Sequence, residues 1–496
     1  MWSMLKGVHS MDDLATQFVS QILKLNPDFA PLDRIYLINR VYALVGQQVS
    51  TKKKVSNLLD LVTLLVDAAV ENQKIKDNIT EREILEAALM DLVTPRPATV
   101  NRLFWNQYQI SPQTATDAFY QLSCQNDYIK TRAIAKNSVF SVATDYGDLE
   151  ITINLSKPEK DPKAIAAAGK QKQVGYPQCQ LCMENEGYLG RLGYPARSNH
   201  RIIRFMLGGE TWGFQYSPYA YFKEHAIFLA QQHRPMMINQ HTFSNLLAIV
   251  RMFPHYFVGS NADLPIVGGS MLAHDHYQGG RHVFPMMKAP VGHHFKVAGV
   301  SAGIVKWPLA TIRLISTSPA KLVNAATKIL QVWQHYSDEA VDIRAYTNQI
   351  RHHTVTPIAY RQGDQYVLDV VLRDNQTSAK YPDGIFHPHP DVQHIKKENI
   401  GLIEVMGRAI LPARLKAEMQ VVADCLLGKK VQVAPYHKKW VAELQRQHQF
   451  TASNVHQILD REIGLVFARV LEDAGVFKQT AQGQAAFKRF IQQLTN

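Results

Sequence analysis

The hydrophobic pattern of this 496-residue chain changes from a helical to a strand-like period near residue 148, which limits the fold more than any other feature. Before that point, apolar residues recur at helical spacing, as at Leu14, Phe18, Ile22 and Leu25. After it, the segment LEITINL alternates apolar and polar residues, which is typical of a half-buried strand. The chain must therefore combine helices with a sheet, and the predicted fold class is α+β.

Further elements follow from the same signals. Ser111 and Pro112 predict a helix that begins with an N-cap and a first-turn proline. The other predicted helices cover 58–70, 83–92, 243–252 and much of the chain after about 410, and the predicted strands cover 226–230, 264–267 and 366–372. We therefore expect a helical region over 1–140, a half with the CxxC and HxHxQ segments over 145–300, a second half over 301–430 and a helical tail over 431–496.

Length and composition indicate a folded, non-exported protein. A chain of this length is expected to form two or three packed units, and 46% hydrophobic with 19% charged residues is close to the globular average. The start of the chain turns acidic before a signal-peptide core develops, and no stretch approaches the roughly 18 apolar residues of a membrane helix. With only four cysteines, a disulfide scaffold is not expected, and the cytoplasm is the expected compartment.

The formal net charge of +12 suits nucleic acid, an anionic surface or small phosphorylated substrates. The basic residues are spread along the chain in short runs, and there is no long basic arm. Charge alone therefore leaves these three partners open.

The most informative stretch is GGSMLAHDHYQGGRHVFP, residues 268–285. In an extended segment His274, His276 and Gln278 point to the same side, because strand side chains alternate. A neutral imidazole can attack a phosphorus atom, and a glutamine can donate to a phosphoryl oxygen without shuttling protons. The adjacent Gly279 and Gly280 would let backbone N–H groups approach phosphate oxygens. The alternative is a pair of packed, hydrogen-bonded histidines in a strand.

The segments GSMLAHDHYQGG, FKEHAIFL and GIFHPHPDVQHIKKENIGLIEVMGRAILP resemble the second, bacterial class of galactose-1-phosphate uridylyltransferases, which belong to the histidine-triad superfamily. The resemblance runs from about residue 10 to beyond 470. It implies two histidine-triad-like halves of mixed sheet between the helical N-terminal region and the helical tail. It also implies ping-pong transfer of UMP from UDP-glucose to galactose 1-phosphate, with His276 as the uridylylated residue and Gln278 as its catalytic partner.

Cys179 and Cys182 have the spacing with which two thiolates grip one metal ion. In the first class of the family, such a pair binds zinc with two histidines, so the resemblance implies a structural zinc held by Cys179, Cys182, His225 and His274. Two reduced cysteines without a metal are the alternative. A thioredoxin-like role is not supported, since no βαβ pattern surrounds the pair.

The candidate substrate-binding residues come partly from position and partly from the resemblance. They are Ser270, Gly279, Gly280, Arg281, Asn185 and Lys397. The resemblance places Asn185 in a uridine-binding region and Lys397 near a sugar phosphate, and Ser270 stands beside Met271, where the first class has a serine. It also suggests a second metal site at His387 and His389, with a histidine-rich surface loop as the alternative.

Three functions remain open at this point: the uridylyltransferase, a histidine-triad nucleotide hydrolase or phosphorylase, and a basic zinc-dependent nucleic-acid-binding protein. Gln278 favours the transferase, because a hydrolase is expected to carry histidine there. The binding protein would need a concentrated basic face or a complete zinc-finger spacing, and the sequence has neither. We therefore expect a homodimeric enzyme that acts on UDP-glucose and galactose 1-phosphate, with no nucleic-acid or membrane partner.

Overall fold

The computed structural model describes residues 13–47, 49, 54–156, 175–269 and 271–495. They fold into two compact units. The first unit comprises the described residues of Met1–Thr131, Pro158–Phe205 and Trp212–Tyr219, and the second comprises those of Arg132–Lys157, Met206–Thr211 and Ala220–Asn496. Each unit has a hydrophobic core of its own.

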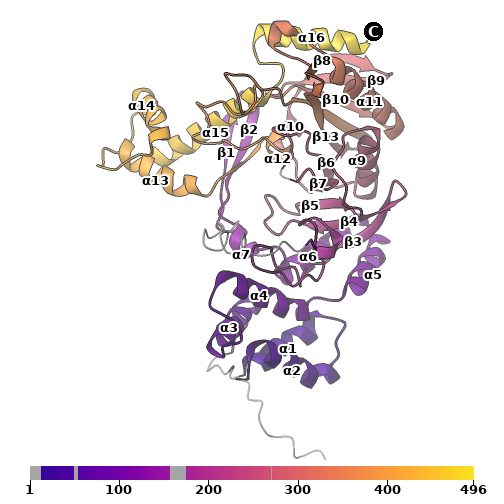
Figure 1. Cartoon of the computed structure of the whole chain (residues 1–496), viewed down its shortest axis with the longest axis vertical. Helices are drawn as coiled ribbons and strands as arrows, with labels where there is room; N and C mark the ends of the chain where they lie inside the picture. The colour runs from indigo at the N-terminus through magenta and orange to yellow at the C-terminus, as the bar shows by residue number, and fades with distance from the viewer. Residues whose placement is uncertain (1–12, 48, 50–53, 157–174, 270, 496) are drawn as a thin grey trace, which may run out of the picture. The chain divides into compact units, whose positions relative to one another are not determined.

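The first unit is mainly helical. Its helices are α1 (Leu14–Leu25), η1 (Pro31–Asp33), α2 (Arg34–Val45), α3 (Leu58–Glu71), α4 (Ile79–Val93), α5 (Pro97–Tyr108) and α6 (Pro112–Gln125), and the short α7 (Thr131–Ile134) follows them. Helices α1 to α4 pack around one apolar core, drawn in indigo and violet in Figure 1. Leu14, Phe18 and Ile22 of α1 are buried there, as their helical spacing predicts.

The predicted helix boundaries are largely confirmed. The Ser111 hydroxyl oxygen accepts the Thr114 N–H at 3.0 Å, so the predicted N-cap of α6 is present. The helix predicted over 83–92 begins earlier, at Ile79, because the Asn78 side chain accepts the Glu81 N–H at 3.0 Å. Asparagine is as good an N-cap as serine, and this signal upstream of the apolar run was missed.

A large sheet of ten strands carries the candidate site. Its strands are β3 (Ile203–Leu207), β4 (Glu210–Tyr216), β5 (Ala226–Ala230), β7 (His276–Gly280), β6 (Phe257–Gly259), β13 (His353–Gln362), β14 (Gln365–Asp374), β10 (Thr311–Ser316), β9 (Val300–Val305) and β8 (Val291–Val297), in their order across the sheet. A smaller sheet contains β1 (Ser138–Thr144), β2 (Gly147–Ile153) and β15 (Arg408–Leu411), with β2 and β15 parallel. A short hairpin joins β11 (Tyr346–Thr347) to β12 (Ile350–Arg351).

The strand order repeats. The first five strands lie as β3-β4-β5-β7-β6, and the last five, counted from the opposite edge, lie as β8-β9-β10-β14-β13. In both sets the fourth and fifth strands in chain order exchange places, and a helix separates the third strand from the fourth. The two sets join where β6 pairs with β13, at Gly259 opposite Ile358. The large sheet therefore consists of two sets of five strands with the same order.

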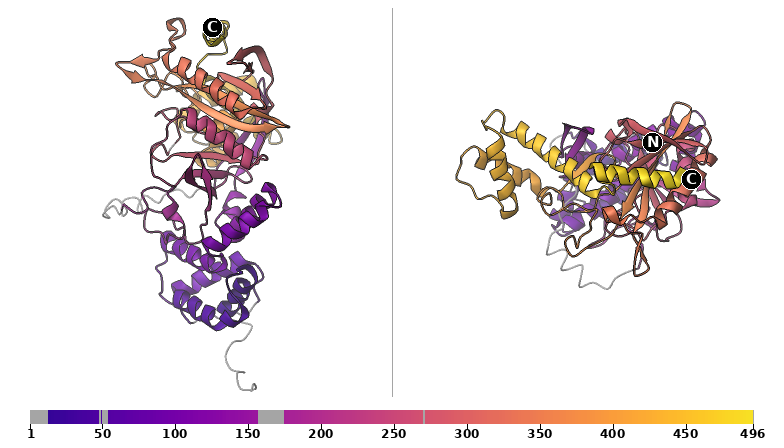
Figure 2. Two further views of the ribbon diagram at one scale, coloured as in Figure 1. Left: turned by 90° about the vertical axis from the view of Figure 1, so that its right-hand side faces the viewer. Right: turned by 90° about the horizontal axis from the view of Figure 1, so that it is seen from above.

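The two repeated helices, α9 (Gln240–Met252) and α11 (Pro319–His335), pack against each other and against the sheet strands β6, β10 and β13 (Figure 2). The short helices α10 (Pro285–Lys288) and α12 (Leu402–Val405) and strand β15 contribute buried apolar residues to the core of the second unit. Helices α13 (Arg414–Leu426), η4 (Pro435–His437), α14 (Lys438–Gln447), α15 (Val455–Ala474) and α16 (Ala481–Thr495) form the helical C-terminal part. The short η2 (Met183–Asn185) and η3 (Glu339–Val341) are the remaining helices within the described ranges.

One predicted strand is wrong. Residues 264–267 form a turn, and Ile266 has a positive φ of 72°, which is uncommon for a β-branched residue. A Cβ on Gly268 would lie 2.6 Å from the carbonyl oxygens of both Ala262 and Leu264, so the chain folds back closely on itself here. The strands predicted over 226–230 and 366–372 are confirmed as β5 and β14. The predicted α+β class is also confirmed.

No helix among the described residues is long and apolar enough to cross a membrane.

Candidate active site and metal cluster

Strand β7 lies inside the large sheet and presents His276 and Gln278 on one face. It pairs with β5 on one side and with β6 on the other, and both pairings are antiparallel. The side chain of Tyr277 points to the opposite face, where its hydroxyl accepts a hydrogen bond from Asn245 of α9 at 3.3 Å. Because α9 covers that face, His276 and Gln278 lie on the face away from the helix, as the period-two pattern predicts.

His276 is held in a single tautomer. Its Nδ1–H donates to the carbonyl oxygen of His274 at 2.8 Å, since a carbonyl oxygen can only accept. The side chain is buried, and burial lowers the pKa of the imidazole to about 4. The ring is therefore neutral near pH 7, and its Nε2 carries the lone pair that a nucleophile needs.

Gln278 forms a hydrogen bond with His225, which was predicted to be a zinc ligand. Nε2 of His225 and Oε1 of Gln278 are 2.9 Å apart. His225 is 3% exposed, and burial lowers its pKa to about 4. This imidazole was predicted to bind zinc, but the structure does not bring it together with the two cysteines.

Gly279 and Gly280 are required by the close approach of neighbouring strands. A Cβ on Gly279 would lie 2.5 Å from the carbonyl oxygen of Phe257, and a Cβ on Gly280 would lie 2.2 Å from that of Glu224. Gly280 also has a positive φ of 142°. The packing of β7 between β5 and β6 is thus a sufficient reason for both glycines, besides the predicted approach to phosphate.

Arg281 and His282 each face a carboxylate. A terminal nitrogen of Arg281 lies 3.1 Å from Oε2 of Glu224, whose side chain is fully buried. Nε2 of His282 lies 2.9 Å from both carboxylate oxygens of Glu150, which also pairs with Arg408 at 2.8 Å. The Arg281 cation, predicted to contact phosphate, therefore has part of its charge compensated within the protein.

Cys179 and Cys182 form a tight turn with their sulfur atoms 3.6 Å apart. Tetrahedral zinc with Zn–S bonds of about 2.3 Å places two thiolates about 3.8 Å apart, so this spacing fits. Burial raises the pKa of the Cys182 thiol to about 12. A bound cation would counteract this shift by favouring the thiolate.

The hydrogen bond made by His274 favours a tautomer that can bind a metal ion through Nδ1. Its Nε2–H donates to the carbonyl oxygen of Ala230 at 2.8 Å, which leaves Nδ1 unprotonated in the neutral ring. Metal-binding histidines commonly make this kind of hydrogen bond through the nitrogen that does not bind the metal. The His233 ring packs edge-on against it, with ring centroids 4.9 Å apart.

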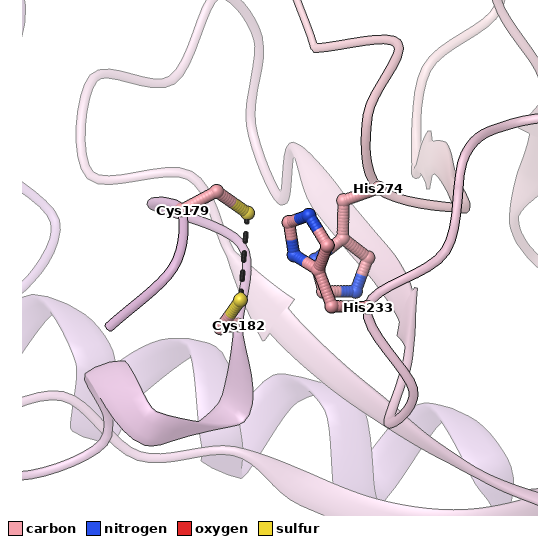
Figure 3. A group of neighbouring side chains, drawn as sticks. All are labelled: Cys179, Cys182, His233 and His274. Carbon is pink, nitrogen blue, oxygen red and sulfur yellow. Dashed lines mark hydrogen bonds between the residues drawn. The ribbon is translucent and has the colours of Figure 1, made fainter. Parts of the chain in front are cut away.

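Ligand atoms of Cys179, Cys182, His233 and His274 all lie within 4.8 Å of one another (Figure 3). In the part of the chain that the structure describes, this is the one group of three or more His, Cys, Asp or Glu side chains that could hold a metal ion. Two sulfurs and two imidazole nitrogens form a donor set that suits zinc. The cluster therefore contains three of the four predicted ligands, with His233 in the place expected for His225.

The antiparallel pairing of β5 and β7 explains the exchange of His225 for His233. Leu229 near the end of β5 pairs with His276, whereas Ala226 at its start pairs with Gly279. A histidine that follows β5 therefore lies near His274, and one that precedes β5 lies near Gln278. The sequence contains both histidines, but only the strand register distinguishes them.

Asn185 stabilises the cysteine turn. Its buried Nδ2 donates to the carbonyl oxygens of Cys179 and Cys182, both at 2.8 Å. Its Oδ1 accepts a hydrogen bond of 2.8 Å from the Tyr194 hydroxyl. Since both ends of this amide already have protein partners, the structure gives Asn185 a role that differs from the predicted contact with uridine.

The remaining predicted site residues are placed as follows. Ser270 lies outside the described residues. Lys397 is exposed, whereas the neighbouring Lys396 is buried and pairs with Glu404 at 2.7 Å. His389 is stacked on Tyr381 and lies 3.3 Å from Asp473.

His387 and His389 have protein partners that suit a structural role. Nε2 of His387 is 3.2 Å from Oδ1 of Asn399, and Nε2 of His389 donates to the carbonyl oxygen of Ile385 at 3.0 Å. Neither histidine belongs to a metal-binding group of three or more side chains within the described ranges. The structure therefore gives no support to the suggested second metal site.

Comparisons with known proteins identify the family of this chain. The family model for the N-terminal domain of galactose-1-phosphate uridyl transferase matches residues 27–235, and the model for the C-terminal domain matches residues 249–442. The chain is 64% identical to galactose-1-phosphate uridylyltransferases of Pediococcus pentosaceus and Lactiplantibacillus plantarum over 96% of its own length and 98% of theirs. It is 59% identical to a Streptococcus pneumoniae enzyme of that name, numbered 2, over 97% of this chain and 99% of that one. Two family models across most of the chain and these near full-length relatives show that it belongs to the galactose-1-phosphate uridylyltransferase family of nucleotidyltransferases.

Proposed function

We propose that this enzyme transfers UMP from UDP-glucose to galactose 1-phosphate through a uridylyl group bound to Nε2 of His276. The observation that carries the proposal is the commitment of Nδ1 of His276 to the backbone of His274, which leaves Nε2 with its lone pair. The substrates are those that the names and family of the relatives indicate.

The reaction divides into two displacements at the α-phosphorus. In the first, the Nε2 lone pair forms a P–N bond while the bond from phosphorus to the bridging oxygen breaks, and glucose 1-phosphate leaves. In the second, a phosphate oxygen of galactose 1-phosphate attacks the same phosphorus, the P–N bond breaks and UDP-galactose forms. Because a sugar phosphate has a second pKa of about 6, it can leave with little help from a general acid.

Gln278 is suited to stabilise the phosphoryl group without donating a proton to the leaving group. It lies two residues after His276 on the same strand face. An amide N–H can donate a hydrogen bond to a phosphoryl oxygen but does not transfer its proton near pH 7. This property favours transfer over hydrolysis.

We further propose that Cys179, Cys182, His233 and His274 hold a structural zinc ion. Zinc with four protein ligands supplies no open position for substrate and would serve to fix the ligand segments. His274 would then hold the backbone carbonyl that orients His276. Ser270, Arg281 and Lys397 remain proposed substrate contacts.

Intact-protein mass spectrometry tests the transfer. The purified enzyme is mixed with UDP-glucose without acceptor, and we expect a mass gain of one UMP that galactose 1-phosphate reverses with release of UDP-galactose. The variant His276→Gln should form no adduct, whereas His241→Gln, at an exposed histidine in the first turn of α9, should form it normally. Accumulation of free UMP without an adduct would indicate a hydrolase instead.

A further inference from the structure

His225 and Gln278 are diagonal neighbours on one face of the sheet. Ile227 of β5 pairs with Gln278 of β7, and His225 lies two residues before Ile227. Residues in this diagonal relation are within reach of one another when the side chains are long. The 2.9 Å distance between Nε2 of His225 and Oε1 of Gln278 is that of a hydrogen bond.

We propose that His225 is a positioning residue that fixes the orientation of the Gln278 side-chain amide, so that the amide N–H₂ group faces the reacting phosphoryl group. This inference rests on the proposed function. It assigns His225 a role in the transfer reaction instead of the metal site.

The direction of the hydrogen bond sets the orientation of the amide. A neutral His225 that carries its proton on Nε2 donates to the Gln278 oxygen, and the amide nitrogen then points away from His225. With the amide reversed, the oxygen would meet the negatively charged phosphoryl oxygens and repel them. Burial lowers the pKa of His225 to about 4, so the neutral form is the one present near pH 7.

The second ring nitrogen of His225 supports this tautomer. Nδ1 is buried and has no hydrogen-bond partner among the residues that the structure describes. An unpartnered buried N–H group is rarer than an unpartnered acceptor. The arrangement that costs less therefore places the proton on Nε2 and a lone pair on Nδ1.

The backbone next to His225 has an unusual conformation and packs closely against β7. Glu224 has a positive φ of 60°, an unusual conformation for a residue with a side chain. The Glu224 carboxylate accepts a hydrogen bond of 2.9 Å from the Tyr256 hydroxyl. Gly280 allows the approach of this segment, because any Cβ there would lie 2.2 Å from the Glu224 carbonyl oxygen.

Two aromatic rings limit the movement of the His225 imidazole. The rings of Phe222 and Tyr221 have centroids 4.7 and 5.4 Å from that of His225. The position of the His225 imidazole is thus fixed by packing against these two aromatic rings and by one hydrogen bond to Gln278. These two contributions can be separated by substitution.

The test uses two variants that each keep one contribution. His225→Phe keeps an aromatic ring beside Phe222 but removes the donor, whereas His225→Gln keeps an N–H donor but removes the ring. We expect His225→Phe to slow uridylylation of His276 by UDP-glucose by about 10- to 100-fold, with little change in the KM for UDP-glucose. We expect His225→Gln to recover most of that rate.

A double variant tests whether His225 acts through Gln278. In a Gln278→Ala background, His225→Phe should cause little further loss of rate, since the amide that it orients is absent. The inference is overturned if His225→Phe keeps the full rate, if His225→Gln is as slow as His225→Phe, or if the two losses multiply in the double variant.

The wild-type enzyme separates this inference from the proposed function. If it forms no adduct with UDP-glucose, the proposed function fails and the inference with it. If the wild type forms the adduct but the variants give one of the overturning results, the role of His225 alone is wrong. Thermal unfolding of each variant confirms that the rates are measured on folded protein.

Discussion

The carbonyl oxygen of His274 accepts a 2.8 Å hydrogen bond from Nδ1 of His276. The ring of His274 is itself fixed, because its Nε2–H donates to the carbonyl oxygen of Ala230 on the neighbouring strand. Whatever holds His274 therefore also determines the tautomer and the position of His276. A metal ion on the cysteine and histidine cluster would do this without contacting the reacting atoms.

This relationship leads to a prediction about zinc. Replacing His233 with Ala removes one of the four clustered ligands and should weaken zinc binding by at least about 10-fold. Replacing His225 with Ala should leave the zinc content at the wild-type value, because that imidazole contacts Gln278 instead. Zinc per chain is measured by elemental mass spectrometry on dialysed protein. Zinc loss in the His225 variant alone would contradict the ligand set.

A second prediction concerns the tight approach at the end of β7. Gly280→Ala places a Cβ against the Glu224 carbonyl oxygen at a positive φ, and should lower the free energy of unfolding by about 2–4 kcal/mol. Gly209→Ala is the matched control, because Gly209 also has a positive φ but no described residue lies within 4 Å of its added Cβ. It should cost only about 1–2 kcal/mol. Equal losses in urea unfolding would show that the close approach is unimportant.

The features that could be predicted from the sequence are those that depend on local periodicity. The common face of His276 and Gln278 follows from the alternation of side chains along a strand, and α1 and α3 follow from helical spacing. The strand predicted over residues 264–267 is wrong, because a short apolar run does not distinguish a strand from a turn. Positive φ at Ile266 is a property of the folded loop that composition does not reveal.

The features that could not be predicted depend on which strands pair and in which register. His225 and His233 stand at opposite ends of β5, and only the antiparallel pairing with β7 places His233 beside His274. The contacts of Asn185 with both cysteine carbonyls depend in the same way on a turn whose geometry the CxxC spacing does not define.

A third prediction separates two adjacent lysines. Lys396 is buried and pairs with Glu404, so Lys396→Met leaves a buried carboxylate without its cation and should cost about 3–5 kcal/mol of unfolding free energy. Lys397→Met is at an exposed position and should change it by less than about 0.5 kcal/mol. If Lys397 contacts galactose 1-phosphate as proposed, Lys397→Met should raise the KM for that substrate without changing the stability of the fold. Urea unfolding and acceptor titration separate the two effects, and a stability loss at Lys397 would contradict this assignment.

The repeated strand order leads to the last prediction, because it gives Gln278 a counterpart. Gln278 pairs with Gly259 of β6 and Ile227 of β5, and Asp369 pairs with Ile358 of β13 and Arg313 of β10. Since Gly259 and Ile358 are themselves paired where the halves meet, Asp369 occupies in the second half the place of Gln278 in the first. Asp369 is fully buried and forms a two-point ion pair with Arg313, at 2.7 and 2.9 Å.

The two positions should therefore respond in opposite ways to substitution. Asp369→Asn leaves the Arg313 cation buried without its counter-charge and should cost about 3–5 kcal/mol of unfolding free energy, while folded molecules still form the adduct at His276. Gln278→Ala loses one hydrogen bond, should cost no more than about 1.5 kcal/mol, and should sharply slow the transfer. Urea unfolding and the rate of His276 uridylylation are measured on both variants. If Asp369→Asn slowed the transfer as much as Gln278→Ala, a purely stabilising role of the Asp369–Arg313 ion pair would be contradicted. The second half would then have to contribute to the chemistry.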